Sequence, residues 1–392
     1  MRSLLHILKM PFCFTRYLYI KEEVRCALLC AILSRRKDEA LFWAAELFCS
    51  GYEDEALGLL WEIYYDFYAA LNPSFETYLI RKCGDTSLPR HSLIISIITN
   101  ICLKPYTTDV YVLRQMFSGA VLSASTTIME PSKWFAEEDF KTLVTYILSK
   151  PMTPQVMCEI RMKALKWCGA KTCLKMRTPP PSSSCNVSDR RRFLSHIIQI
   201  FTLQVYEVPK KNRLNISDKF IDIMKATGFA PIVPTANPST PIKNFSEFSK
   251  TIRAQNILKM GCKYKINESG FLPLFELQRY KIGETGMLIR YHSEWLHYAS
   301  VTPLWADRIS KFGGAPDISK KQVIFNDISK EEAFYELHGL EPDEQPLEVQ
   351  DACVALVEKE THGLKMFCKQ FGALNVFNYN NDLVEAKGGV IY

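Results

Sequence analysis

Residues 35–71, RRKDEALFWAAELFCSGYEDEALGLLWEIYYDFYAAL, concentrate nine aromatic side chains in two helix-like patterns separated by very few residues. Asp38 stands where a helix would begin, apolar residues recur after it at helical spacing, and Gly51 stands where that helix would end. A second pattern begins at the acidic run 53–55 and continues to Pro73, which cannot extend it. Because the connection is so short, we expect the two helices to be near-antiparallel neighbours.

The second of these helices carries aromatic residues on more than one side. Tyr64 and Tyr65 are consecutive, so they cannot point the same way from a helix. We therefore expect this helix to be sandwiched, with each aromatic ring burying roughly 150–250 Å² between stacked helix pairs. The alternative is an exposed aromatic groove that grips a partner.

The rest of the chain continues mainly in helical patterns. Helices are predicted at 19–35, 74–84, 90–103, 107–119, 132–149, 153–175, 193–206, 217–227, 246–259, 329–339 and 346–371, with shorter ones between 271 and 311, the last opened by Thr302-Pro303. The one convincing strand pattern is 320–327, which either pairs with another short segment or forms an edge. No fixed repeat length is evident. The predicted fold class is mainly α: an irregular array of stacked antiparallel helix pairs, a second helical region and at most a minor β element.

Two proline-rich stretches set the predicted domain organisation. With 392 residues the chain exceeds the usual size of a single hydrophobic core. Residues 176–192 hold three consecutive prolines followed by serines, which is typical of a linker. The predicted N-terminal helical array is therefore 10–175, and a second helical region is 193–372. That region contains an extended proline-rich segment at 228–245, and a weakly ordered tail follows at 373–392.

Composition excludes several classes of protein. The chain is 47% hydrophobic and 23% charged, an ordinary folding composition rather than that of a disordered protein. No uninterrupted apolar stretch of about 20 residues exists, so no membrane span is expected. Thirteen cysteines are scattered through helical patterns, and an odd number cannot all pair within the chain, which favours a reducing compartment. Charged residues interrupt the N-terminal apolar run and no small-residue cleavage site follows, so we expect no signal peptide.

No catalytic or metal-binding motif is found. The phosphate-binding loop, the dinucleotide-binding glycine motif and the serine nucleophile elbow are all absent. Cys168 and Cys173 form one close pair, but no second close pair completes a tetrahedral zinc site. His292 and His297 are too far apart on a helix to act as paired zinc ligands. We therefore predict no enzyme activity, no cofactor and no metal site.

The strongest functional pattern is a basic segment at 161–213. This segment contains twelve lysines and arginines and only two acidic residues, so its net charge is +10. Clustered cations neutralise phosphates independently of base sequence. The candidate nucleic-acid-binding residues are Lys163, Lys166, Lys171, Lys175, Arg177, Arg190, Arg191, Arg192, Lys210, Lys211 and Arg213. The alternative is that they solubilise a linker, or meet the acidic region 327–360 of this chain or of another copy.

Several stretches resemble a known group of viral proteins. They are CFTRYLYIKEEV (13–24), DEALFWAAELFCSGYEDEAL (38–57) and LIRYHSEWLHYASVTPLWADRI (288–309), followed by LEPDEQPLEVQ (340–350). These resemble conserved but functionally uncharacterised proteins of large nucleocytoplasmic DNA viruses, of the giant-virus type, over most of the chain. The resemblance implies a viral protein located in the host cytoplasm, at the viral factory, or in the virion. It supplies no catalytic residues.

These patterns together predict a helical, non-enzymatic interaction protein. It would scaffold an assembly of the virion, or of the viral replication or transcription machinery, through protein partners that the sequence does not name. The alternative function is that of a nucleic-acid-binding accessory factor, which uses the basic segment to contact the phosphate backbone.

Overall fold

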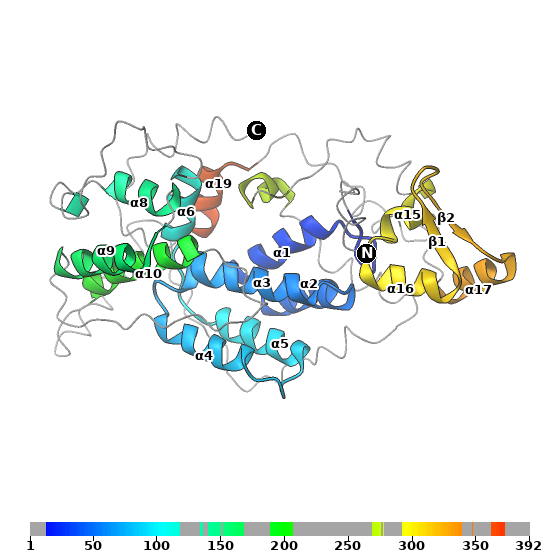
Figure 1. The fold of residues 1–392 in the computed structure, drawn as a ribbon, viewed down its shortest axis with the longest axis horizontal. Coiled ribbons are helices and arrows are strands. Elements are labelled where there is room, and N and C mark those ends of the chain that lie inside the picture. Colours follow the sequence, from blue (N-terminus) through cyan, green and yellow to red (C-terminus); the bar gives the residue numbers. More distant parts are fainter. Residues whose placement is uncertain are drawn as a thin grey trace. The chain divides into compact units, whose positions relative to one another are not determined.

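Figure 1 shows the fold as a computed structural model. The structure describes residues 13–117, 134–135, 140–149, 152–167, 189–206, 269–275, 277, 292–338, 347 and 362–372. Within these residues the protein is mainly α-helical, and its one sheet has two strands. The predicted fold class, mainly α with a minor β element, is confirmed.

The chain divides into two compact units, each assembled from separate stretches of sequence. Unit 1 comprises Met1–Ala56, Arg90–Ile98 and Pro241–His362, and unit 2 comprises Leu57–Pro89, Thr99–Thr240 and Gly363–Tyr392. This division differs from the predicted one, in which a linker at 176–192 separates an N-terminal from a C-terminal region. Helical periodicity shows which residues face a core, but not which distant helices share it.

Several predicted segments lie outside the described residues. They are the helices at 217–227 and 246–259, the proline-rich segment 228–245, the tail 373–392 and the predicted linker up to residue 188. The last four residues of the predicted linker are described and are helical, because helix α10 begins at Asp189.

In unit 1 the N-terminal helices form the core. The described elements are α1 (Lys21–Leu33), α2 (Lys37–Cys49), η3 (Ser269–Phe275), α15 (Trp295–Ala299), α16 (Pro303–Lys311), β1 (Gly314–Asp317), β2 (Gln322–Phe325) and α17 (Ile328–His338), with parts of α3 (Glu53–Ile63) and α5 (Arg90–Ile101). Ten of the thirteen residues of α1 are buried, so it needs cover on several sides. Both α2 and η3 pack against it. The segment η3 is a 3-10 turn rather than an α-helix, consistent with Pro273 inside it, which cannot donate a backbone hydrogen bond.

Residues 292–338 of unit 1 form a small module, called here the C-terminal module. It contains α15, α16, the β1–β2 hairpin and α17. The predicted strand at 320–327 is β2, which pairs antiparallel with β1 from Gly314 opposite Phe325 to Asp317 opposite Gln322. Trp305 and Phe334 are buried in this module, and their rings are 6.4 Å apart, so α16 and α17 share an aromatic centre.

Unit 2 is a second helical core. Its described elements are the rest of α3 and α5, the π-helix η1 (Tyr64–Tyr68), α4 (Pro73–Cys83), α6 (Asp109–Phe117), α8 (Phe140–Ser149), α9 (Pro154–Trp167), α10 (Asp189–Tyr206) and α19 (Leu364–Phe371). Helix α10 packs against α6, α8 and α9. Its Leu194 and Ile197 join Ile147 of α8 and Ile160 of α9 in one apolar cluster.

The aromatic residues of 35–71 are core residues, as predicted. All nine are buried except Phe48, which is half-buried. The sequence did not predict that the second helix changes at Tyr64 into a π-helical turn, in which the Ala69 N–H donates to the Tyr64 carbonyl oxygen at 2.8 Å. All five residues of this turn are buried, including the charged Asp66. Such wide turns are frequent at functional positions.

Candidate functional site

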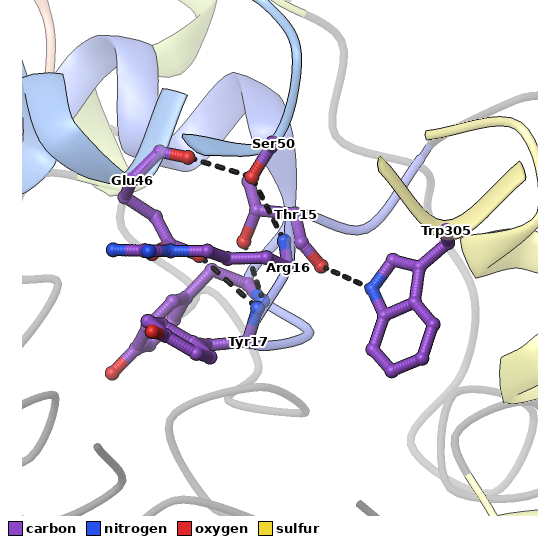
Figure 2. Close-up of polar contacts among 7 residues, drawn as sticks. Thr15, Arg16, Tyr17, Glu46, Ser50 and Trp305 are labelled. Carbon is purple, nitrogen blue, oxygen red and sulfur yellow. Dashed lines mark hydrogen bonds and ion pairs between the residues drawn. The ribbon is translucent and has the colours of Figure 1, made fainter. Parts of the chain in front are cut away.

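A buried ion pair fixes the loop that precedes α1 (Figure 2). The Arg16 Nε donates to Glu46 Oε2 of α2 at 2.9 Å. The backbone N–H of Tyr17 donates to Glu46 Oε1 at 3.1 Å, and that of Arg16 donates to Ser50 Oγ at 2.8 Å. Leu18 has a positive φ of 62°, which lets the loop turn tightly enough for these contacts. Both carboxylate oxygens of Glu46 are therefore engaged within the chain.

The opposite charges of Arg16 and Glu46 stabilise each other inside the fold. Both side chains are buried. Burial is the largest single effect and lowers the pKa of the Arg16 guanidinium, but the charge of Glu46, together with Tyr17, Cys49 and the hydrogen bond to Glu46, raises that pKa above its ordinary value. The Arg16 guanidinium also lies 4.2 Å from the centre of the Tyr17 ring. The cluster therefore holds its two opposite charges together as one buried pair.

The same loop positions α16. The Trp305 Nε1–H donates to the Thr15 carbonyl oxygen at 3.3 Å, and the Thr302 hydroxyl donates to the Phe14 carbonyl oxygen. Gly51 ends the turn after α2 with a φ of 89°, and a Cβ there would lie 2.6 Å from the Pro303 Cβ. A glycine is therefore required, and this part of unit 1 holds α16 in a defined orientation.

Arg308 on α16 is a half-buried arginine whose charge has no ionic partner among the residues that the structure describes. The side chain is half-buried, and its guanidinium carbon lies 4.7 Å from the centre of the Trp305 ring. Among the residues that the structure describes, no hydrogen bond or ion pair of the Arg308 side chain is found. The neighbouring Lys311 is paired with Asp307 at 2.6 Å. Burial lowers the pKa of the Arg308 guanidinium, yet arginine stays charged at any physiological pH.

His338 at the end of α17 lies beside this arginine. Its ring centre is 6.1 Å from that of Trp305. Burial, followed by the charges of Arg308 and Lys311, lowers the pKa of His338 to about 4, so the imidazole is uncharged at neutral pH. Arg308 was not predicted as a functional residue. Its only signal in the sequence is the three-residue spacing from Trp305, which puts both residues on one face of a helix.

The C-terminal module also exposes large apolar side chains. Ile328 and Leu337 of α17 are 75% and 68% exposed. Among the described residues ten large apolar side chains are exposed, and half of them lie in this module: Val301, Ile318, Ile324, Ile328 and Leu337. The module is therefore richer in exposed large apolar side chains than the rest of the described chain.

The described part of the predicted basic segment is partly engaged within unit 2. Arg192 Nε donates to Glu76 Oε1 at 3.1 Å, and Arg191 pairs with Glu62 at 3.0 Å. Arg190 is exposed and donates to the Leu148 carbonyl oxygen at 2.7 Å. Lys163 is half-buried and Lys166 is exposed, both on α9. Lys171, Lys175, Arg177, Lys210, Lys211 and Arg213 lie outside the described residues.

Arg192 belongs to a buried polar network around Glu76. The Tyr65 hydroxyl donates to Glu76 Oε1 at 2.9 Å, and His196 Nε2 lies 3.5 Å from Glu76 Oε2. Burial would raise the pKa of Glu76, but the hydrogen bond and charge of His196, followed by Arg192 and Tyr65, lower it to about 2. These contacts connect the π-helix with α4 and α10.

Asp66 of the same π-helix is also buried and paired. Arg114 donates to Asp66 Oδ2 at 2.6 Å, and Arg191 Nε lies 3.6 Å from Asp66 Oδ1. Burial raises the pKa of Asp66, although both arginines oppose that shift. The π-helical turn thus positions a carboxylate for structural pairing with α6 and α10.

The Glu76 network predicts a pH-dependent stability. Because the folded-state pKa of Glu76 is about 2 and the ordinary value is 4.5, the carboxylate stabilises the fold above about pH 4.5. That stabilisation is lost as the pH falls toward 2. We expect Glu76→Gln to lower the free energy of unfolding by about 2–3 kcal/mol at pH 7 and by less at pH 3.

Urea unfolding of the two proteins at both pH values checks this expectation. Glu159→Gln, at an exposed position on α9, is the control and should unfold like the parent. An equal loss of stability for Glu76→Gln at both pH values would contradict the role of the carboxylate charge.

Two further features concern metal ions and membranes. No three His, Cys, Asp or Glu side chains within the described ranges are grouped so as to hold a metal ion. Cys168 and Cys173 are outside those ranges, whereas His292 and His297 lie within them, and His297 is buried. In the part of the chain that the structure describes, no helix is long and apolar enough to cross a membrane.

Comparison with known proteins gives no relative. No family model, no curated protein and no solved structure matches this chain.

Proposed function

We propose that this protein is a non-enzymatic helical interaction protein that scaffolds a viral assembly. The assembly would belong to the virion or to the viral replication or transcription machinery, and the protein would act in the host cytoplasm or within the virion. The observation that carries the interaction role is the C-terminal module, with its concentration of exposed large apolar side chains.

The charge of the module favours a protein partner. Residues 292–338 contain five lysines and arginines against seven acidic residues, a net charge of −2. Nucleic-acid interfaces are strongly positive, whereas protein interfaces combine apolar side chains with a few arginines and aromatic residues. The composition of the C-terminal module is that of a protein interface.

The buried carboxylates support a non-enzymatic function, because their charges are used in ion pairs within the chain. Glu46, Asp66 and Glu76 are buried carboxylates, and each is paired with an arginine of its own unit. Reactive carboxylates instead lie in clefts where substrate can reach them. The viral setting rests on the resemblance of residues 13–24, 38–57 and 288–309 to giant-virus proteins.

Mass spectrometry of purified virions, run beside complexes isolated from infected cells, tests this function. We expect the chain to be recovered in at least one of the two preparations in fixed proportion to specific other proteins. Recovery only as a free chain in both preparations would contradict a scaffold.

Nucleic-acid binding through the basic segment remains the second candidate. The observation that favours it is the end of α9, where Lys166 is exposed beside Trp167, whose side chain is 40% exposed. Exposed aromatic and cationic side chains together are a common platform for single strands. If this role holds, Lys166→Glu should weaken binding to every sequence about equally in a gel-shift titration, and the affinity should fall steeply with salt.

A further inference from the structure

We propose that Arg308 is the anchor of a docking site on the C-terminal module for an acidic peptide segment of a partner protein. The inference rests on the proposed interaction function and adds the chemistry of the partner. The observation that carries it is a half-buried guanidinium with no ionic partner among the described residues, held against the Trp305 ring at 4.7 Å.

The anchor is held in place before any partner binds. Trp305 is completely buried, and its Nε1–H donates to the Thr15 carbonyl oxygen at 3.3 Å, so the ring is fixed. Stacking on that ring orients the guanidinium and leaves its N–H groups unused. A fixed, partly desolvated arginine loses little entropy when it binds a carboxylate with two parallel hydrogen bonds.

No described residue in the immediate surroundings neutralises this charge. Asp307, the adjacent carboxylate, is paired with Lys311 at 2.6 Å. The other groups that act electrostatically on Arg308 are Arg16, whose like charge is already bound to Glu46, and the Tyr17 ring, whose hydroxyl stays protonated because burial raises its pKa. His338 is uncharged at neutral pH. An anionic partner is therefore the complement of this position.

The apolar surface indicates a peptide rather than a phosphate polymer. Leu337 precedes His338 on α17, and Val301 precedes α16 by two residues, and both side chains are exposed. The five lysines and arginines of the module are outnumbered by its seven acidic residues, so the module does not present the positively charged surface that a nucleic acid requires. An arginine with neighbouring apolar side chains is the usual composition of a protein-binding hot spot.

Selection of short random peptides displayed on phage against the immobilised full-length chain tests the inference. We expect the selected peptides to be enriched in Asp or Glu next to aliphatic residues. Arg308→Gln should weaken binding of the selected peptides by about tenfold or more, and Arg308→Lys should weaken it less. Lys320→Gln is the control, because this exposed lysine lies in the turn between β1 and β2, outside α16 and α17, and it should change binding by less than about twofold.

Three results would overturn the inference. One is the absence of acidic enrichment, and another is unchanged peptide affinity in Arg308→Gln. The third is a fluorescent oligonucleotide that binds in an Arg308-dependent way, which would assign the site to phosphate. Affinity purification distinguishes this outcome from failure of the proposed interaction function. If the interaction function is wrong, no protein co-purifies with the parent chain. If only the anchor is wrong, the same proteins co-purify with the parent and with Arg308→Gln.

Discussion

Glu46→Ala is expected to lower the free energy of unfolding of unit 1 by about 3–5 kcal/mol. The substitution leaves the buried guanidinium of Arg16 without its carboxylate and removes the acceptor of the Tyr17 N–H. Breaking a buried pair costs more than the pair contributes, because the remaining charge is desolvated and uncompensated. Differential scanning calorimetry and urea unfolding of the full chain measure the effect.

Glu22→Gln is the matched control for this prediction. Glu22 pairs with Arg25 at 2.8 Å, but on the partly exposed side of α1, where ion pairs contribute little. We expect this variant to unfold almost like the parent. Similar stability of Glu46→Ala and Glu22→Gln would show that the loop before α1 does not depend on the Arg16–Glu46 pair.

Trp43→Ala is expected to destabilise unit 1 by a similar amount, about 3–5 kcal/mol. The Trp43 side chain is 0% exposed and lies edge-on to Tyr19 and Phe42, with ring centres 5.4 and 4.9 Å away. Its Nε1–H donates to Glu39 Oε1 at 3.3 Å, so alanine also leaves that acceptor without its donor. The large cavity and the lost hydrogen bond act in the same direction.

Trp167→Ala provides the comparison for an exposed indole. Because the Trp167 side chain is 40% exposed, its removal should change the melting temperature far less than removal of Trp43. A Trp43→Ala protein that melts like the parent would contradict the core assignment and favour the alternative in which the aromatic residues form a partner groove.

Local patterns predicted many of the helices because their signals are local. The helix expected between Asp38 and Gly51 is α2 (Lys37–Cys49), and Thr302-Pro303 opens α16 as expected. Proline at the first position of a helix and acidic residues in its first turn act on their own backbone, so no tertiary information is needed. The π-helical turn at Tyr64–Tyr68 was missed, because helical periodicity gives no signal for one extra residue in a turn.

Contacts between distant residues could not be predicted from the sequence. Arg192 and Glu76 are 116 residues apart, and in the sequence each resembles a solvated surface charge. The basic segment was expected to meet phosphates, or else to solubilise a linker or meet the acidic region 327–360 of this chain or of another copy. In the structure Arg191 meets Glu62 and Asp66, and Arg192 meets Glu76. The partners of the other basic residues stay a prediction.

Arg308 illustrates the same limit at the candidate site. An arginine three residues after a tryptophan is common in a sequence, and only the folded module shows that Arg308 is half-buried with no ionic partner among the described residues. The exposed apolar residues are similar, because Ile328 and Leu337 fit a helical pattern whose buried face is instead marked by Phe334. Ile328 and Leu337 are recognised as surface residues by their exposed fraction in the structure, because their hydrophobicity alone suggests core positions.

Affinity purification of the full chain from infected cells tests the central claim most directly. The parent is compared with a variant carrying Ile328→Ser and Leu337→Ser, and with Leu103→Ser as the control at an exposed apolar position outside the module. We predict a defined set of proteins that co-purifies with the parent and the control after nuclease treatment, and that is lost from the double variant. A set that is unchanged in the double variant, or that disappears from the parent on nuclease treatment, would contradict the account.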